Sequence, residues 1–225
     1  MNIILVHGTW VDASSWGKII PILQNARHNV VAAQLTLTSV ADDVSTVKRA
    51  IDFIGEPVIL VGHSYGGFVI TNAAYNDAKV KGLVYLNAFA PDEGQSMSDL
   101  VDSSKLPKGF LIFDNAGFVY VNPEMFWQIC AQDIDPVQAK VMAATQKPTN
   151  QSILIEKSGP PAWKQLPTWY QVSEKDRIIP PATQRIFAKL MNATVTISIP
   201  SSHSSPMSHP NETAQLIINA AKALK

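Results

Sequence analysis

Short runs of apolar, often β-branched residues alternate along the chain with longer stretches in which apolar positions recur every three or four residues. Apolar runs without polar alternation are typical of strands that are buried on both faces. Such runs predict strands at residues 3–6, 29–33, 58–61, 80–86, 167–172 and 194–199. The helical spacing predicts helices at residues 15–26, 40–54, 182–190 and 212–224. This alternation indicates an α/β fold: a mostly parallel sheet of about six strands with helices on both faces.

Residues 91–166 interrupt the alternation. Their strand signal is weak, and prolines and glycines separate short helical patterns at residues 124–132 and 137–144. A structureless loop of this length is uncommon within a compact domain. We therefore predict a small, mainly helical cap at residues 91–166, inserted into a core formed by residues 1–90 and 167–225.

The charge balance narrows the expected partners. The 225 residues include 18 basic and 18 acidic side chains, so the formal net charge is zero. Such balance provides no electrostatic attraction to nucleic acid or to anionic membranes. No apolar run approaches the ~18 residues of a membrane helix, and the chain starts on a predicted strand rather than on a signal peptide. We expect a cytoplasmic protein that binds neither nucleic acid nor membrane, and we make no prediction of its oligomeric state.

The strongest chemical signal directly follows the predicted strand at residues 58–61. The motif G-x-S-x-G occupies residues 62–66, and a helical pattern begins near Tyr65. This motif makes a sharp strand-to-helix turn with the serine at its apex, where small neighbours avoid collisions. The helix N-terminus also presents free N–H groups to a developing oxyanion. We therefore predict Ser64 as a nucleophile; the alternative is a tight turn with an incidental serine.

A serine hydroxyl needs a general base to act as a nucleophile. His203 and His209 both follow the last predicted strand, where the base belongs in the chain order Ser…Asp/Glu…His. His203 is nearer to the strand end, whereas His209 adjoins Pro210 at the expected start of the final helix. We therefore favour His203 as the base.

The carboxylate that orients this base is expected after the preceding strand. Asp176 lies in the loop between that strand and the predicted helix at residues 182–190. Glu174 is a rival in the same loop, and Asp92, which follows the predicted strand at residues 80–86, is a second rival. We favour Asp176, although its carboxylate could simply pair with a neighbouring basic side chain.

Two further groups complete the predicted site. An oxyanion hole needs two donors, for which we predict the backbone N–H of Tyr65, directly after the nucleophile, and that of Thr9, after the first strand. Aromatic side chains suit the walls of a substrate pocket. Trp10, Phe126 and Trp127 are our candidates for this role, although each is also compatible with core packing.

We expect neither a metal ion nor a cofactor. The single cysteine, Cys130, makes a thiolate zinc site and an internal disulfide impossible. No histidine pair occurs at helical spacing, and the chain contains no phosphate-binding P-loop and no G-x-G-x-x-G motif.

Taken together, these motifs resemble the small, cofactor-free bacterial α/β-hydrolases, a branch akin to the plant methylesterases and hydroxynitrile lyases. The matching segments are LVHGTW at residues 5–10, GHSYGG at 62–67, AFAPDEG at 88–94, PAWK at 161–164, DRIIPP at 176–181, and SH at 202–203 with Pro210 seven positions after the histidine. The resemblance extends over essentially the whole chain. It implies an α/β-hydrolase core, a short helical cap and a triad of Ser64, Asp176 and His203. It also places Asp92 in the family's P-D-x-G stretch rather than at an acid position.

Two departures from the hydroxynitrile lyases bear on the reaction. Those enzymes carry Thr where Gly8 stands, and Lys directly after the catalytic histidine, where this chain has Ser204. We therefore expect a serine hydrolase that cleaves small carboxylic esters through an acyl-enzyme intermediate. The alternatives are a lactonase, amidase, thioesterase or C–C (hydroxynitrile) lyase that uses the same residues, or a ligand-binding sensor with negligible turnover.

Overall fold

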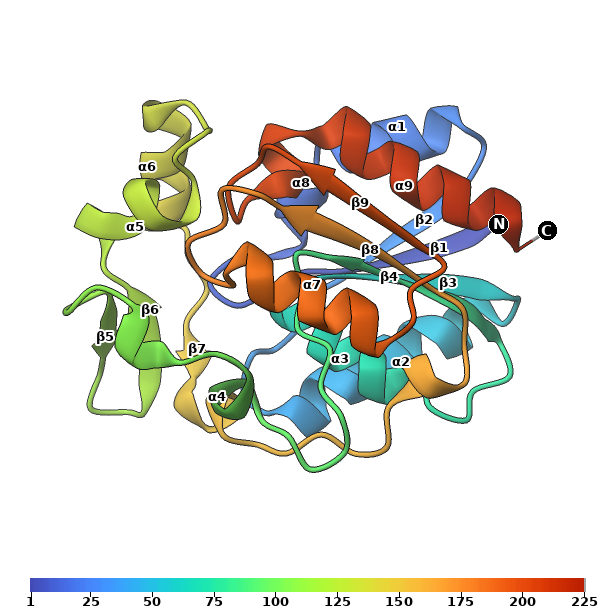
Figure 1. The fold of residues 1–225 in the computed structure, drawn as a ribbon, viewed down its shortest axis with the longest axis horizontal. Helices are drawn as coiled ribbons and strands as arrows, with labels where there is room; N and C mark the ends of the chain where they lie inside the picture. Colours follow the sequence, from blue (N-terminus) through green and yellow to red (C-terminus); the bar gives the residue numbers. More distant parts are fainter. Residues whose placement is uncertain (225) are drawn as a thin grey trace.

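The computed structural model describes residues 1–224, and its strands form two separate sheets (Figure 1). The larger sheet contains six of the described strands: β1 (Asn2–Val6), β2 (Asn29–Ala33), β3 (Val58–His63), β4 (Val80–Leu86), β8 (Thr168–Ser173) and β9 (Val195–Ile199). Their order across the sheet is β2-β1-β3-β4-β8-β9, and every neighbouring pair runs parallel. The predicted mostly parallel sheet is therefore confirmed.

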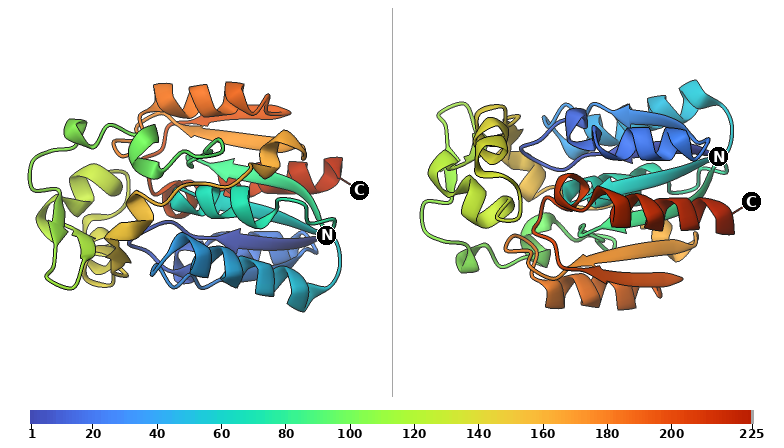
Figure 2. Two further views of the ribbon diagram at one scale, coloured as in Figure 1. Left: turned by 90° about the horizontal axis from the view of Figure 1, so that it is seen from below. Right: turned by 90° about the horizontal axis from the view of Figure 1, so that it is seen from above.

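Helices cover both faces of this sheet, as Figures 1 and 2 show. One face packs against α1 (Ile19–Asn25) and α9 (Pro210–Ala223). The other face packs against α2 (Val40–Ile54), α3 (Tyr65–Ala73) and α7 (Pro181–Leu190). Because the central strands are covered on both sides, they are apolar at successive positions rather than at every second one.

The bounds of α2 match the prediction from the sequence, whereas the bounds of α1 differ from it. Helix α2 has the predicted bounds, because the Ser39 side chain caps its first turn and Gly55, with φ of 68°, ends it in the left-handed conformation. The predicted helix at residues 15–26 is instead split into a 3-10 helix, η1 (Ala13–Trp16), and α1. Proline is tolerated only in the first turn of an α-helix, so Pro21 requires α1 to begin just before it.

Residues 91–166, which we call the inserted segment, leave the large sheet after β4 and return to it at β8. Figure 2 shows that most of this segment lies beyond one end of the sheet, opposite to the chain termini. Its helices are α4 (Met97–Leu100), α5 (Pro123–Cys130) and α6 (Pro136–Ala144), with 3-10 turns η2 (Ser103–Lys105), η3 (Gln151–Leu154) and η4 (Ala162–Lys164). It also contains three strands that the sequence analysis did not predict: β5 (Leu111–Phe113), β6 (Phe118–Val121) and β7 (Thr149–Asn150).

These three strands form the second, antiparallel sheet. The turn between β5 and β6 is held by the Asp114 carboxylate, which accepts hydrogen bonds from the N–H groups of Ala116 and Phe118 at 2.9 and 2.8 Å. Strands of two to four residues are too short to show a period in the sequence. The expectation of a mainly helical segment was therefore incomplete.

Hydrogen bonds attach the inserted segment to loops at the carboxyl ends of the large sheet. The indole N–H of Trp10 donates to Val119 O of β6 at 3.1 Å. On the same side, Asn150 N donates to Leu37 O at 2.8 Å. Near α5, Ser204 N donates to Cys130 O at 3.1 Å. The segment is thereby fixed over the sheet end at which the predicted site residues lie. Within the described residues, no helix is long and apolar enough to cross a bilayer.

Candidate active site

Ser64 occupies the turn between β3 and α3 in a backbone conformation that few residues adopt. Its φ is 54° and its ψ is −123°. A Cβ atom on Gly62 would lie 2.5 Å from Gly66 O, and one on Gly66 would lie 2.2 Å from Val6 O. Both glycines are therefore required, because α3 must approach β3 and β1 closely for the serine to stand at the apex.

The structure brings together the three residues predicted to form the triad. His203 Nε2 lies 2.9 Å from Ser64 Oγ, and His203 Nδ1 lies 2.7 Å from Asp176 Oδ2. Ser64 follows β3, Asp176 follows β8 and His203 follows β9, so the contacts form where the carboxyl ends of parallel strands meet. If Nδ1–H donates to the carboxylate, Nε2 is free to accept the serine proton.

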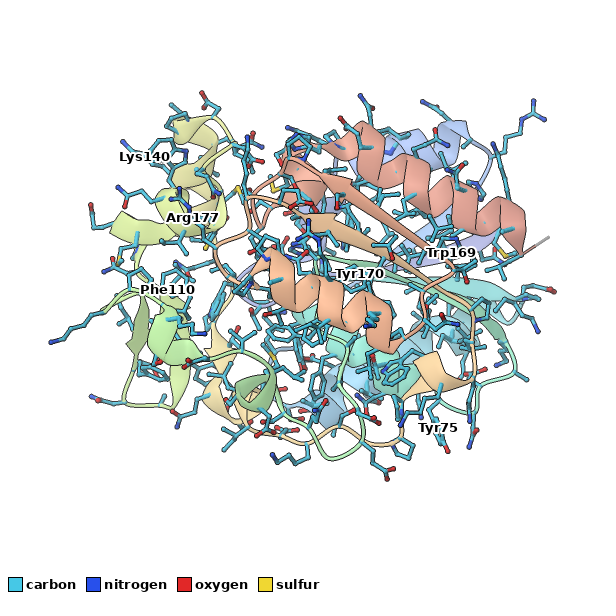
Figure 3. The ribbon with its side chains drawn as sticks, in the orientation of Figure 1. Tyr75, Phe110, Lys140, Trp169, Tyr170 and Arg177 are labelled. Atoms are coloured by element: carbon cyan, nitrogen blue, oxygen red, sulfur yellow. The ribbon has the colours of Figure 1, made fainter. Side chains whose placement is uncertain are left out.

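Asp176 is held by its own loop and by α7. Its Oδ1 accepts hydrogen bonds from the N–H groups of Ile178 and Ile179 at 2.8 and 3.0 Å. Its Oδ2 accepts a third from Gln184 Nε2 at 2.9 Å. Arg177 does not pair with Asp176: its guanidinium donates to Gln128 O at 2.8 Å and lies beside α5 (Figure 3). These donors hold the carboxylate in place with its Oδ2 facing the histidine.

The rival residues lie elsewhere. Glu174 forms an ion pair with Arg185 at the surface. Asp92 is 2.5 Å from Lys164 Nζ, and this ion pair holds the pKa of Asp92 below its ordinary value. His209 precedes α9, where Ser208 Oγ lies 2.9 Å from its Nδ1. None of these side chains contacts Ser64 in the described residues.

The loop after β1 packs directly on the predicted nucleophile. A Cβ atom on Gly8 would lie 2.8 Å from Ser64 Cβ, and the next residue, Thr9, lines the same cavity as Ser64. Tyr65 is the first residue of α3, so its backbone N–H has no acceptor within the helix. Its phenol points the other way and donates to Asp43 Oδ2 at 2.9 Å. Thr9 and Tyr65, the residues predicted to supply the oxyanion donors, therefore both lie beside Ser64.

A cavity of about 160 Å³ opens beside Ser64. Its walls are mainly aliphatic and aromatic, and most of them belong to the inserted segment. The lining residues are Thr9, Trp10, Ser64, Phe89, Met97, Ser98, Val101, Leu106, Leu111, Phe113, Leu154 and Ile178. No ionisable acid or base is among these described residues, so the cavity suits an uncharged apolar group.

Only one of the three predicted pocket aromatics lines this cavity. Trp10 does so, with φ of 60° and an edge-to-face contact to Phe110, which Figure 3 labels in the inserted segment. Phe126 is instead 2 % exposed in the hydrophobic core. Trp127 is 40 % exposed, and its indole N–H donates to Ile134 O at 3.1 Å. Helix α5 directs Phe126 into the hydrophobic core and Trp127 toward the surface, so neither side chain lines the cavity beside Ser64.

Two buried histidines next to the site are neutral at ordinary pH. Burial lowers the pKa of His63 to about 3, helped by the neighbouring His203, and lowers that of His7 to about 4. His63 Nε2 lies 2.7 Å from His203 O. His7 Nε2 accepts a hydrogen bond from Leu35 N at 3.1 Å and thereby orders the loop after β1.

Asn87 and Gln184 are not among the residues predicted from the sequence, although both contact predicted triad residues. Gln184 donates to Asp176 from α7, and Asn87 follows β4 with its amide next to His203 and Asp176. An asparagine after a buried strand at the carboxyl end of a parallel sheet is the signal that identifies such a residue. In the part of the chain that the structure describes, no group of three or more His, Cys, Asp or Glu side chains is arranged to hold a metal ion.

With this geometry in place, comparison with known proteins identifies the family. The sequence model of the alpha/beta hydrolase family matches residues 3–216. The chain therefore belongs to the alpha/beta hydrolase family.

Its relatives include hydrolases and a lyase. A carbendazim hydrolyzing esterase from Nocardioides sp. (strain SG-4G) is 35 % identical over 122 residues, which are 48 % of this chain and 50 % of that protein. The alpha-hydroxynitrile lyase of Arabidopsis thaliana is 33 % identical over 123 residues, 48 % of each chain. The chain is thus matched over about half the length of these two proteins. Methylesterase 2 of Arabidopsis thaliana is 25 % identical over 237 residues, 92 % of this chain and 90 % of that protein.

Solved structures show the same fold. A pyrethroid hydrolase from Sphingobium faniae JZ-2 superimposes with a TM-score of 0.85 at 21 % identity, covering 99 % of this chain and 98 % of that chain. A polyneuridine aldehyde esterase gives a TM-score of 0.84 at 19 % identity, covering 98 % of both chains. The predicted α/β-hydrolase fold and the resemblance to the methylesterase and hydroxynitrile lyase group are confirmed.

Proposed function

We propose that the protein is a serine esterase that hydrolyses small carboxylic esters through an acyl-enzyme intermediate. The observation that carries this proposal is the unbroken series of contacts from Asp176 through His203 to Ser64, at the edge of an apolar cavity. The names of several relatives, among them a carbendazim hydrolyzing esterase and a methylesterase, support the same reaction class.

The first half of the proposed reaction acylates the serine. Ser64 Oγ attacks the acyl carbon of the ester while His203 Nε2 takes the hydroxyl proton. The carbonyl oxygen becomes an oxyanion and accepts hydrogen bonds from the backbone N–H groups of Thr9 and Tyr65. The tetrahedral intermediate collapses, the C–O bond to the alcohol breaks, and His203 returns the proton to the leaving alcohol oxygen. Asp176 holds Nδ1–H and stabilises the imidazolium throughout.

The second half releases the acid. His203 Nε2 takes a proton from water as the water oxygen attacks the acyl carbon. The same two backbone donors stabilise the second oxyanion. The bond to Ser64 Oγ then breaks, and Ser64 regains its proton from His203, so no cofactor is consumed.

The cavity supports a neutral, apolar substituent on the ester. Its walls offer aliphatic and aromatic contacts, and no cation lies among its described lining residues to bind a substrate carboxylate. We propose that the inserted segment acts as a cap that holds this substituent over Ser64. Transfer of apolar surface from water into the cavity then provides the binding free energy.

Two positions favour hydrolysis over cyanohydrin cleavage. A side chain at position 8, such as the Thr expected in hydroxynitrile lyases, would collide with Ser64, because even a Cβ atom lies 2.8 Å from Ser64 Cβ. Ser204 follows His203 and donates through Oγ to Cys130 O at 2.9 Å. This position therefore places no cation beside Ser64.

The direct test is hydrolysis of p-nitrophenyl acetate and butyrate by the wild type and by Ser64→Ala, together with labelling by an alkyl phosphonate. We expect turnover and a single labelled serine in the wild type, and neither in Ser64→Ala, with an unchanged melting temperature. Ser98→Ala is the matched control, because Ser98 lines the cavity but donates to Leu154 O. Equal hydrolysis by wild type and Ser64→Ala, or labelling of another serine, would contradict the proposal.

A further inference from the structure

We propose that Asn87 is a positioning residue of the proton relay: its amide fixes the His203 main chain and the Asp176 carboxylate in the geometry that proton transfer requires. This inference rests on the proposed esterase function. Asn87 lies outside the sequence motifs described above, and it does not line the cavity beside Ser64.

The place of Asn87 in the fold brings it to the centre of the site. It directly follows β4, which lies between β3 and β8 in the sheet, and it is fully buried. Its N–H continues the parallel ladder by donating to Gln171 O at 2.8 Å. Its φ is 36°, in the left-handed region that asparagine tolerates better than most residues. The backbone therefore turns away after β4 and leaves the side chain between two other strand ends.

The contacts of the amide define which way it points. Asn87 Nδ2 lies 2.8 Å from His203 O and 3.4 Å from Asp176 Oδ2. Both of those oxygens act only as acceptors when the carboxylate is ionised, so the nitrogen must face them. On the opposite side, Asn87 Oδ1 accepts a hydrogen bond from Ser205 Oγ at 2.7 Å. Ser205 in turn lies 2.9 Å from Gln171 Nε2, which anchors the amide to β8.

The His203 carbonyl is held by two side chains from different strands. Besides Asn87, His63 Nε2 lies 2.7 Å from His203 O and 3.2 Å from Asn87 Nδ2. Because burial keeps His63 neutral, with a pKa of about 3, its single ring proton is available for His203 O. His203 lies outside any regular element, in the loop between β9 and α8 (Ser205–Ser208). The position of its backbone therefore depends on contacts of this kind.

The second amide proton of Asn87 points to Asp176 Oδ2, the carboxylate oxygen that takes part in the proposed relay. Asp176 Oδ2 is the oxygen that faces His203 Nδ1, and Asn87 Nδ2 is 3.3 Å from that same ring nitrogen. One amide group thus spans the backbone of the base and the carboxylate that orients its ring. A shift of either partner would lengthen the contact between His203 Nε2 and Ser64 Oγ, which is 2.9 Å. Reaction geometry is sensitive to displacements of this size.

Asn87→Gly and Asn87→Asp form a matched pair for the test, because both residues tolerate the left-handed φ. Glycine removes the amide. We expect kcat for p-nitrophenyl butyrate to fall about tenfold, as for the loss of one or two buried hydrogen bonds. KM should change by less than about twofold, because Asn87 does not line the cavity.

Asn87→Asp keeps the shape and replaces the donor with a titratable oxygen. When protonated, this carboxyl can still donate to His203 O. When ionised, it places a negative oxygen against His203 O and Asp176 Oδ2, which repels both. We therefore expect the kcat of Asn87→Asp, relative to wild type, to decline as pH rises, with a descending limb that wild type and Asn87→Gly lack. A residue with a merely structural role would lower kcat equally at every pH.

Thr71→Val is the control, because it removes different buried hydrogen bonds, those of Thr71 Oγ1 with Gly67 O at 2.8 Å and with Tyr85 OH at 2.9 Å. It should lower the melting temperature and leave kcat unchanged. A kcat of Asn87→Gly within twofold of wild type, or an Asn87→Asp pH profile of wild-type shape, would overturn the proposal.

A readout that does not need turnover separates this proposal from the esterase assignment. The low-field ¹H NMR signal of His203 Nδ1–H should shift or broaden in Asn87→Gly and stay in place in Thr71→Val. If the wild type hydrolyses no ester, the proposed function fails, and the NMR signal still decides whether Asn87 positions the relay. An unchanged signal in Asn87→Gly would refute that role.

Discussion

The carboxyl ends of the large sheet and the inserted segment contribute to the site in different ways. The strand ends supply buried polar groups, each with several partners: Asp176 accepts from two backbone N–H groups and from Gln184 as well as facing His203. The inserted segment supplies most of the cavity walls, which are largely apolar. Polar contacts are directional and apolar contacts are not. On the proposed function, the chemistry therefore depends on the strand ends, and the choice of substrate depends on the inserted segment.

Asp176→Asn is the sharpest test of the strand ends, and it should have the largest effect. An amide cannot stabilise the imidazolium and favours the wrong tautomer of His203, so we expect kcat to fall on the order of 10⁴-fold with the fold intact. Steady-state hydrolysis of p-nitrophenyl butyrate measures the change. Glu174→Gln and Asp92→Asn are the controls, since both carboxylates form surface ion pairs. If Asp176→Asn retains the wild-type rate, one of these rivals supplies the acid.

A loss of stability between pH 7 and pH 5 should arise from the strand ends rather than from the inserted segment, because residues 91–166 contain no histidine. Burial lowers the pKa of His63 to about 3 and that of His7 to about 4, from an ordinary value of 6.5. Below about pH 6.5 these two histidines bind protons in the unfolded chain but not in the folded chain. The free energy of unfolding should therefore fall between pH 7 and pH 5, by about 2 kcal/mol for each histidine.

Urea unfolding at a series of pH values measures this dependence. In His63→Gln, the slope of unfolding free energy against pH should decrease by the equivalent of about one proton in that range. An unchanged slope would show that His63 is not the group held neutral by burial. Because urea unfolding is measured without substrate, this result reports on stability and not on activity.

The smallest of these effects should come from the inserted segment. Met97 lines the cavity, so Met97→Ala lengthens it, and we expect the ratio of kcat/KM for p-nitrophenyl hexanoate to that for the acetate to rise about tenfold. The kcat for the acetate should change little. Val137→Ala is the control, because Val137 is 71 % exposed in the same segment and lies outside the cavity. An unchanged chain-length preference in Met97→Ala would mean that the inserted segment does not select the substrate.

The difference between the strand ends and the inserted segment also explains how much of the structure could be predicted from the sequence. Buried parallel strands show unbroken apolar runs, so the large sheet and the loops that follow its strands are predictable. The turn at Ser64 needs two glycines for steric reasons, and those reasons are visible as a motif. The position of Asp176 relative to His203 then follows from the meeting of parallel strand ends.

The strands and the cavity walls of the inserted segment could not be predicted, for physical reasons. Leu106, Leu111 and Leu154 form cavity walls, but leucine is equally common in any core, so no pattern marks them. Phe126 and Trp127 are aromatic and so suit the wall of a pocket, yet the packing of α5 places them away from the cavity.

Asn87 lies outside the inserted segment, and it contacts residues that lie in or after three other strands. Its role therefore depends on the tertiary approach of residues more than 100 positions apart.

The strand order has a consequence for when activity arises. Ser64 and His203 are 139 positions apart, and His203 follows β9, which lies at the edge of the sheet and pairs only with β8 among the described strands. Closing so long a stretch of chain is entropically costly, and contacts of this range form late in folding. Pairing of β9 with β8 therefore brings His203, the proposed base, to Ser64. On the proposed mechanism, a chain whose β9 has not yet paired with β8 has no base beside Ser64, so ester hydrolysis would begin only once the sheet is complete.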